Sequence, residues 1–383
     1  MKVKGIHARQ IFTTNSRKTV EVEIETSKGM VRSSVPIGTS TGRYEVKSLH
    51  VEQALNKIGI IRRHFISEDF SSQKEVDDML HYIDESKDFR EIGGNVSLAI
   101  SSAFLKAFAQ ENNQQVFEYL GGKEMPRPIC NVVGGWHRSN DAQEFLLIPV
   151  HQKSFLDSIT RITSAYHELG NRLKAEDVSF NFSKNIESGW ATKLRLSSVM
   201  DILSKLAEKY GVKIGVDFAA TQFWNGENYI YSDGKRTRTT QLEWMNWLAT
   251  MYHVIYFEDP FHEDDFIGFS TLTHELYKKL VCGDDMLATN IDRLKESIRF
   301  NAVSAAIVKP NQIGTITAVA KFVDEAKRNK IATVMSHRSG ETDDTLICHL
   351  AVGLGCDYIK LGTSGERTDK INEMIRIEER LTR

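Results

Sequence analysis

Cysteine is scarce in this chain of 383 residues, and its four cysteines lie far apart. They are Cys130, Cys282, Cys348 and Cys356, and no two of them form a CxxC pair. A disulfide framework or a cysteine-based zinc site needs closer, paired spacing. We therefore expect reduced, mostly buried thiols, as in a cytoplasmic protein.

Long apolar runs and an excess of positive charge are also missing. No apolar run approaches the ~20 residues that cross a bilayer, and residues 1–9 lack the apolar core of a secretory signal. The formal net charge is −2, which argues against bulk nucleic-acid binding. The composition, 41% hydrophobic and 26% charged, is that of a globular protein. We expect a soluble cytoplasmic protein with no membrane or nucleic-acid partner.

The first third of the chain combines strand-like and helix-like patterns. Residues 19–25 alternate apolar and charged side chains, and a turn at 27–29 leads to a second strand over 30–35. Ser72 stands three residues before Glu75, as in a capping box at a helix start. The apolar positions after it share a helical spacing and are Val76, Met79, Leu80 and Ile83. A longer helix is predicted from Val96 to about Gln110.

These patterns predict an α+β domain over residues 1–122. Glycines and prolines cluster between 121 and 128, which marks a boundary. The second domain is expected over residues 128–383. Its later part repeats short β-rich runs separated by amphipathic stretches such as 292–299 and 318–330. That alternation is typical of a parallel β/α barrel.

Each of six consecutive β-rich runs ends at an ionisable residue. These are Asp217, Glu258, Asp284, Lys309, His337 and Lys360. A single one of them can simply cap the next helix. Strand C-termini of a barrel open on its active-site face, so six together are expected to converge there.

Three of these residues are carboxylates on neighbouring strands, and such a cluster needs a cation. All-oxygen ligands favour Mg²⁺ or Mn²⁺ over zinc. Lys309 is expected to face the same cavity, and two interpretations of its role are open. It is either a structural counter-ion of the carboxylates or a general base whose pKa is lowered by burial and a neighbouring cation.

Three further segments are candidates for the site. Residues 336–341 place His337, Arg338 and Ser339 before a predicted helix, which suggests a phosphate site; a surface helix start is the alternative. Residues 38–42 are a glycine-flanked loop, either a lid or an ordinary turn. Residues 185–189 place one carboxyl group in an irregular loop, where a catalytic acid can stand.

Taken in order, these segments resemble the enolase family. The resemblance is densest over residues 336–345 and is supported by residues 258–261, 283–285 and 309–314. It implies an enolase-like α/β fold, with an N-terminal α+β capping domain followed by a modified β/α barrel. It also implies a hydro-lyase of glycolysis and gluconeogenesis that dehydrates 2-phosphoglycerate to phosphoenolpyruvate with two Mg²⁺ ions.

The resemblance assigns roles to matching positions. The catalytic set comprises the base Lys309, the acid Glu187, its partner Glu144, and His137. The substrate-binding set comprises His337, Arg338, Ser339, Lys360 and Ser40. The metal-binding set comprises Asp217, Glu258, Asp284 and, for the second ion, Ser40. Arg9 and Glu21, with Arg376 and Glu379, match positions that pair across the family's dimer interface, which implies a homodimer.

The chain departs from the family pattern at the rim of the site. Asn15 replaces an arginine, Trp136 replaces a small residue, and residues 185–189 keep only part of a glycine-rich acidic motif. The chain is also shorter than is usual for the family. Two alternatives to enolase activity stay open. One is an enolase paralogue acting on a related phosphonate or phosphorylated hydroxy acid, and the other is a catalytically idle binding paralogue.

Overall fold

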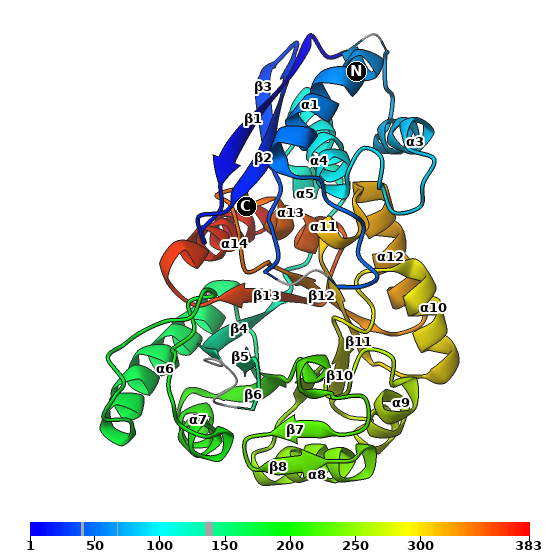
Figure 1. The fold of residues 1–383 in the computed structure, drawn as a ribbon. Helices are drawn as coiled ribbons and strands as arrows, with labels where there is room; N and C mark the ends of the chain where they lie inside the picture. The colour runs from blue at the N-terminus through cyan, green and yellow to red at the C-terminus, as the bar shows by residue number, and fades with distance from the viewer. Residues whose placement is uncertain (40–41, 67, 135–140) are drawn as a thin grey trace.

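The computed structural model describes residues 1–39, 42–66, 68–134 and 141–383. Figure 1 shows an N-terminal sheet and helices packed on one side of a larger barrel. The predicted fold class, a capping α+β domain followed by a modified β/α barrel, is confirmed. No helix among the described residues is long and apolar enough to cross a membrane.

The N-terminal sheet is antiparallel, in the order β1 (Gly5–Phe12), β2 (Lys18–Thr26) and β3 (Gly29–Ser34). The predicted hairpin is therefore confirmed, whereas β1 was not predicted. Val20, Val22 and Ile24 are fully buried because this face of β2 packs against helix α4 (Gly94–Glu111).

The described residues of the N-terminal part form four more helices: α1 (Val51–Ile61), α2 (Arg63–Ile66), α3 (Gln73–Ile83) and α5 (Val116–Tyr119). Ser72 caps α3, as predicted, by accepting a 3.3 Å hydrogen bond from the Glu75 amide. The Glu75 carboxylate accepts hydrogen bonds from the amide and the hydroxyl of Ser71. In a capping box this carboxylate would bind the amide of the cap residue Ser72, so its observed partner is one residue earlier.

Eight strands close the barrel. In order around it they are β4 (Arg127–Gly134), β5 (Glu144–Pro149), β6 (Val212–Asp217), β9 (Tyr256–Glu258), β10 (Leu280–Gly283), β11 (Ala305–Val308), β12 (Ala332–Ser336) and β13 (Tyr358–Gly362). Strand β5 is antiparallel to both neighbours, and the remaining pairs are parallel. The last six strands match the predicted β-rich runs, while β4 and β5 were not predicted. A small hairpin, β7 (Tyr229–Tyr231) and β8 (Gly234–Arg236), is inserted after β6.

Helices surround the barrel in Figure 1. They are α6 (Phe155–Glu176), α7 (Leu196–Tyr210), α8 (Arg238–Met251), α9 (Phe266–Glu275), α10 (Ile291–Phe300), α11 (Pro310–Ile313), α12 (Ile316–Arg328), α13 (Leu346–Gly353) and α14 (Thr368–Leu381). Short 3₁₀ turns cover Ala220–Phe223 and Gly365–Arg367. The two predicted amphipathic stretches correspond to α10 and α12. All four cysteines are free and buried, as expected.

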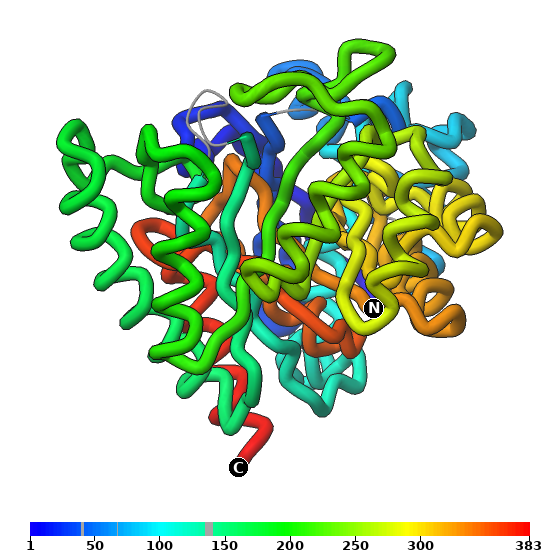
Figure 2. The backbone as a smooth tube through the Cα atoms, turned by 90° about the horizontal axis from the view of Figure 1, so that it is seen from below, coloured from blue at the N-terminus to red at the C-terminus, as the bar shows by residue number. Residues whose placement is uncertain are grey.

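The N-terminal part is joined to the barrel through α12. Asp77 of α3 accepts a 2.8 Å hydrogen bond from the Thr317 amide, and Ser101 of α4 accepts one of 3.0 Å from the Ile316 amide. These are amides of the first turn of α12, which have no partner within their own helix. In Figures 1 and 2 the cyan N-terminal helices accordingly lie beside the orange α12.

Candidate active site

Strand geometry aims several ionisable residues into the barrel. Successive side chains of a strand point to opposite faces, so residues two apart share a face. Cys282 and Ile307 belong to the apolar cluster inside the barrel, while Ala306 and Val308 pack outside it. Asp284 and Lys309 each stand two positions beyond an interior residue and therefore continue the inward row. The same spacing relates Tyr256 to Glu258, and Tyr358 to Lys360.

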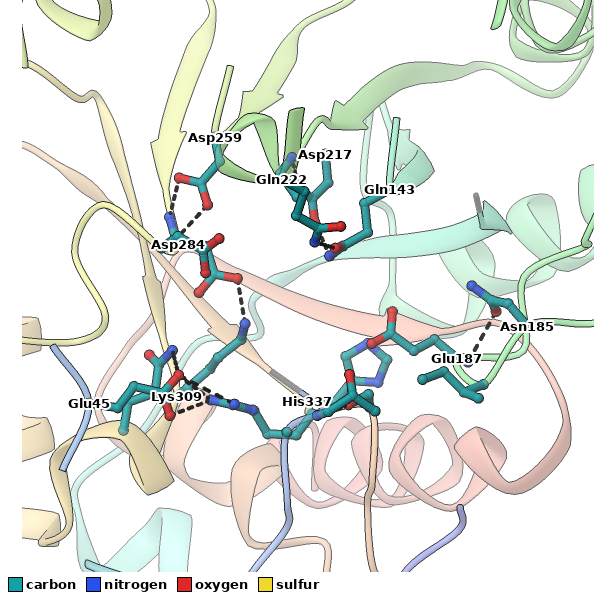
Figure 3. Close-up of a pocket in the computed structure, with 18 of the residues that line it drawn as sticks. Glu45, Gln143, Asn185, Glu187, Asp217, Gln222, Asp259, Asp284, Lys309 and His337 are labelled. Atoms are coloured by element: carbon teal, nitrogen blue, oxygen red, sulfur yellow. Dashed lines mark hydrogen bonds and ion pairs between the residues drawn. The ribbon is translucent and has the colours of Figure 1, made fainter. Parts of the chain in front are cut away.

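A cavity of about 380 Å³ lies at this end of the barrel. Seven of the predicted site residues line it: Glu187, Asp217, Asp284, Lys309, His337, Arg338 and Ser339. Figure 3 shows Lys309 and Asp284 on one side and Glu187 and His337 on the other. Ser40 and His137 were also predicted here, and both lie outside the described residues.

Lys360 holds the buried carboxylates together. It stands inside β13 rather than at its end, and its Nζ lies 2.6 Å from Glu144, 3.0 Å from Asp217 and 2.7 Å from Glu258. Burial lowers the pKa of Lys360, but the surrounding carboxylates outweigh it and hold this pKa well above the ordinary value. Lys360 is therefore a cation at neutral pH. Glu144, Glu258 and Lys360 are buried and do not line the cavity.

The antiparallel direction of β5 explains the position of Glu144. Because β5 runs against β6, its first residue, Glu144, pairs with Asp217, the last residue of β6. Asn131 donates a 2.8 Å hydrogen bond to Glu144. Burial raises the pKa of Glu144 to about 8, with the Lys360 ammonium opposing the rise and the nearby Glu187 adding to it.

Glu187 stands in a tightly bonded irregular loop, as predicted. The side-chain oxygen of Asn185 accepts from the amides of Glu187 (3.0 Å) and Gly189 (2.9 Å). Ser188 adopts a left-handed φ of 67°, which closes the turn. The loop thereby fixes the backbone on both sides of the Glu187 carboxyl.

His337 completes a group with the two glutamates. Polar atoms of Glu144, Glu187 and His337 lie within 4.8 Å of one another. Burial, and then the positive charges of Arg367 and Lys360, hold the pKa of His337 well below its ordinary value. The imidazole is neutral, and among the described residues its Nδ1 finds no hydrogen-bond partner. It can therefore contact a small molecule in the cavity.

Lys309 forms a 2.5 Å ion pair with Asp284. Burial alone lowers the pKa of Lys309, but the Asp284 carboxylate raises it further, and the net pKa is above the ordinary value. The lowered pKa expected of a general base stays a prediction for a site in which Asp284 serves as a metal ligand. The ammonium is the cation that balances Asp284 here.

A second group of carboxylates borders Lys309. Oxygens of Asp259, Asp284 and Asp285 lie within 4.8 Å of one another. Asp259 accepts from the amides of Asp284 (3.0 Å) and Asp285 (2.7 Å), which orients the pair. Burial and the charge of Asp284 raise the pKa of Asp285 to about 7.

Asp284 belongs both to this group and to the predicted metal-binding set, and its surroundings fit a divalent cation. The Oδ1 atom of Asp284 is buried and has no hydrogen-bond partner among the described residues. A buried carboxylate oxygen without a donor is costly unless a cation or water satisfies it. Oxygen-only ligands suit Mg²⁺ or Mn²⁺.

Arg338 and Ser339 line the cavity, but the expected helix start does not follow them. Helix α13 begins at Leu346, so its amides do not contribute to a phosphate site here, and that part of the expectation is wrong. Ser339 accepts a 2.9 Å hydrogen bond from the Thr39 amide of the N-terminal part. The Arg338 guanidinium lies 3.5 Å from Glu45 and 3.3 Å from Asn311.

Gly38 permits the close approach of Arg338. A Cβ at this position would lie 1.8 Å from the guanidinium, so a side chain would displace the arginine. The N-terminal loop and the barrel therefore meet directly over the cavity.

Sequence reasoning missed several residues of the site. Asp259 and Asp285 directly follow predicted site residues, and this adjacency was the available signal. Glu45 carried none, because its segment is far from the predicted strand ends, and Arg367, seven residues after Lys360, belongs to no predicted motif. Only the folded chain brings Glu45 to the cavity wall and Arg367 behind it.

Comparisons with known proteins agree with this geometry. Residues 3–120 match the family model described as "Enolase, N-terminal domain", and residues 122–383 match "Enolase, C-terminal TIM barrel domain". The chain is 38% identical to the enolase of Archaeoglobus fulgidus, with 99% of this chain and 98% of that protein covered. It is 37% identical to the enolase of Methanocorpusculum labreanum (99% and 99%) and 36% to that of Halobacterium salinarum (98% and 98%).

Against these relatives the chain is not short, because nearly their whole length is matched. The likeness runs through both parts of the structure and includes the strands that carry the cavity residues. With both domains matched in order along one chain, this protein belongs to the enolase family.

Proposed function

We propose that the protein catalyses the Mg²⁺-dependent dehydration of 2-phosphoglycerate to phosphoenolpyruvate. The observation that carries the proposal is the pair of opposed groups in one cavity. Lys309 with Asp284 faces Glu187 with His337 across a space of about 380 Å³. A base and an acid on opposite sides of a substrate suit removal of a proton from one carbon and of hydroxide from the next.

In the proposed first step, Lys309 removes the proton on the carbon beside the substrate carboxylate. It can act as a base only as a neutral amine, and it would lose its ion pair where Asp284 serves as a metal ligand. Asp217, Glu258 and Asp284 would hold one Mg²⁺, and Ser40 would contact the second. The chemistry that these ions supply is positive charge beside the substrate carboxylate, which stabilises the enediolate.

In the second step, Glu187 gives its proton to the β-hydroxyl, which then departs as water. Glu144 and His137 would assist. Arg338 and Ser339 would bind the phosphate, with His337 contacting the substrate and Lys360 adding positive charge behind the carboxylates. Arg338 must exchange its Glu45 contact for the phosphate, and a guanidinium binds phosphate better than a weak 3.5 Å pairing.

The remaining proposals concern the whole chain. We infer domains at 1–122 and 128–383, a cytoplasmic location and a homodimer. Arg9 is salt-bridged within its own chain to Glu21 at 2.5 Å, on the surface that the family resemblance assigns to the dimer. Light scattering that finds only monomer at micromolar concentration would overturn the dimer.

A substrate comparison tests the proposed function. The protein with Mg²⁺ is given 2-phosphoglycerate or its phosphonate analogue in parallel, and product formation is followed in the ultraviolet. We expect 2-phosphoglycerate to react faster, and fluoride with phosphate to suppress the reaction. Turnover of the phosphonate alone would assign the chain to a paralogue with a different substrate.

A further inference from the structure

Arg367 is a fully buried arginine behind the cavity wall. It ends the 3₁₀ turn Gly365–Arg367 after β13, and only 1% of its surface is exposed. Among the described residues, its hydrogen bonds all go to backbone carbonyls. Nη1 donates to Arg338 (2.7 Å), and Nη2 donates to Ser339 (2.6 Å) and Ile186 (2.8 Å).

Those three carbonyls belong to the two loops that carry opposite ends of the proposed substrate site. Arg338 and Ser339 form the phosphate end, and Ile186 immediately precedes the acid Glu187. The Glu366 carboxylate is 3.8 Å from Arg367 and 45% exposed, too far for a hydrogen bond. The guanidinium is thus used to join two loops, a geometry that its fork of donors suits.

Packing at Gly362 reinforces the junction. A Cβ on Gly362 would lie 2.5 Å from Cγ of Arg367 and 2.7 Å from the carbonyl oxygen of Glu187. The arginine stem and the backbone of the acid therefore rest on the same glycine of β13. Tyr166 supports the other flank by donating a 2.8 Å hydrogen bond to the Ser188 carbonyl.

Lys309 is held by a separate set of contacts. Its amide donates to the Thr289 hydroxyl at 2.9 Å, and Thr289 in turn donates to Gln312 at 2.7 Å. Arg367 takes part in none of these described contacts. The base and the acid of the proposed reaction thus have independent supports.

We propose that Arg367 is a positioning residue that sets the distance between the acid Glu187 and the phosphate end of the site. This inference rests on the proposed function and adds a support for one of its two steps. Loss of Arg367 is expected to impair expulsion of the hydroxyl while leaving proton abstraction by Lys309 largely intact.

The test compares two rates in Arg367→Lys at saturating 2-phosphoglycerate with Mg²⁺. One rate is exchange of the substrate α-proton in deuterated water, and the other is formation of phosphoenolpyruvate. We expect phosphoenolpyruvate formation to fall by about 10²-fold, as a misplacement near 1 Å can cause, while exchange changes far less. Free guanidinium at millimolar concentration should restore part of the dehydration rate of Arg367→Ala.

Two further variants make the result decisive. Arg293→Lys alters another buried arginine that donates to backbone carbonyls, those of Met286 and Glu263, outside both loops. It should leave the ratio of the two rates unchanged. Gly362→Ala perturbs the same junction without removing the arginine, and it should show the selective loss even if the Arg367 variants fold poorly.

Equal loss of both rates in Arg367→Lys and Gly362→Ala would overturn the inference, since a purely structural role moves them together. An unchanged rate ratio would overturn it as well. If the unaltered protein neither exchanges nor dehydrates 2-phosphoglycerate, the proposed function has failed instead.

Discussion

Lys309 and Glu187 approach the cavity from opposite sides, which allows their steps to be separated by mutation. Glu187→Gln should lower dehydration by about 10²–10⁴-fold, the usual contribution of a general acid. It should still exchange the substrate α-proton in deuterated water, because Lys309 remains. Lys309→Ala should do neither. Proton NMR of the substrate measures exchange, and exchange that survives in Lys309→Ala would assign the base to another residue.

Glu45 pairs with the Arg338 guanidinium, which would have to bind the phosphate of the proposed substrate. Its side chain is 8% exposed and accepts from Arg338 at 3.5 Å and from Gln312 at 3.2 Å. Glu45→Gln keeps the shape and removes a negative charge, so inorganic phosphate should inhibit at a roughly tenfold lower concentration. Inhibition by phosphate at fixed 2-phosphoglycerate measures this. An unchanged inhibition constant would mean that Glu45 does not compete with the anion.

At the scale of elements, α12 depends on the N-terminal part for its first turn. Asp77 accepts from the Thr317 amide, from the Ser101 hydroxyl at 2.6 Å and from the Gln73 amide group at 3.0 Å. Asp77→Ala leaves these buried donors unpaired and should lower the free energy of unfolding by about 1–3 kcal/mol. Urea denaturation measures the change.

Asp78→Ala is the matched control on the same helix. The Asp78 side chain is 57% exposed and, among the described residues, pairs with Lys74, so its loss should change stability by roughly 0.5 kcal/mol or less. Equal effects of the two substitutions would contradict the proposed role of Asp77.

The elements also show how far sequence reasoning reached. The strands that end at, or one residue before, Asp217, Glu258, Asp284, Lys309 and His337 were predictable, because each pairs a β-rich run with an ionisable residue. Strand β5 was not, since an antiparallel strand presents its first residue, Glu144, to the site. Only the family resemblance named that residue.

Other features depend on contacts between distant segments. Arg367 is far in sequence from the 185–189 loop that it supports, so no local pattern reveals it. The start of α13 was misplaced because residues 340–345 bond to the N-terminal part, as in the backbone pair of Gly340 and Ile37, before the helix begins.

Across the whole molecule, Asp344 joins the N-terminal part to the barrel. It bonds Lys106 of α4 at 2.7 Å, Ser33 and Ser34 of β3 at 2.8 and 3.0 Å, and the Leu346 amide at 2.9 Å. Burial alone raises the pKa of Asp344, but Lys106 and the other donors outweigh it and hold this pKa below the ordinary value.

A carboxylate with a depressed pKa stabilises the fold above its unfolded pKa of about 3.9 and loses this effect as the pH falls through the folded pKa. Asp344→Asn should therefore reduce the free energy of unfolding by about 1–3 kcal/mol at pH 7. The difference from the unaltered protein should shrink as the pH falls below about 4. Urea midpoints across this range measure it, with the exposed neighbour Asp343→Asn as the control. A difference independent of pH would contradict the assignment.

The central claim is that this cavity dehydrates 2-phosphoglycerate with the help of a divalent cation. The most direct measurement follows phosphoenolpyruvate absorbance from the purified protein with Mg²⁺, then with excess chelator, and then with Mg²⁺ restored. We predict formation with Mg²⁺, none in chelator, and recovery when Mg²⁺ is added back. No phosphoenolpyruvate with Mg²⁺, or an undiminished rate in excess chelator, would contradict the account.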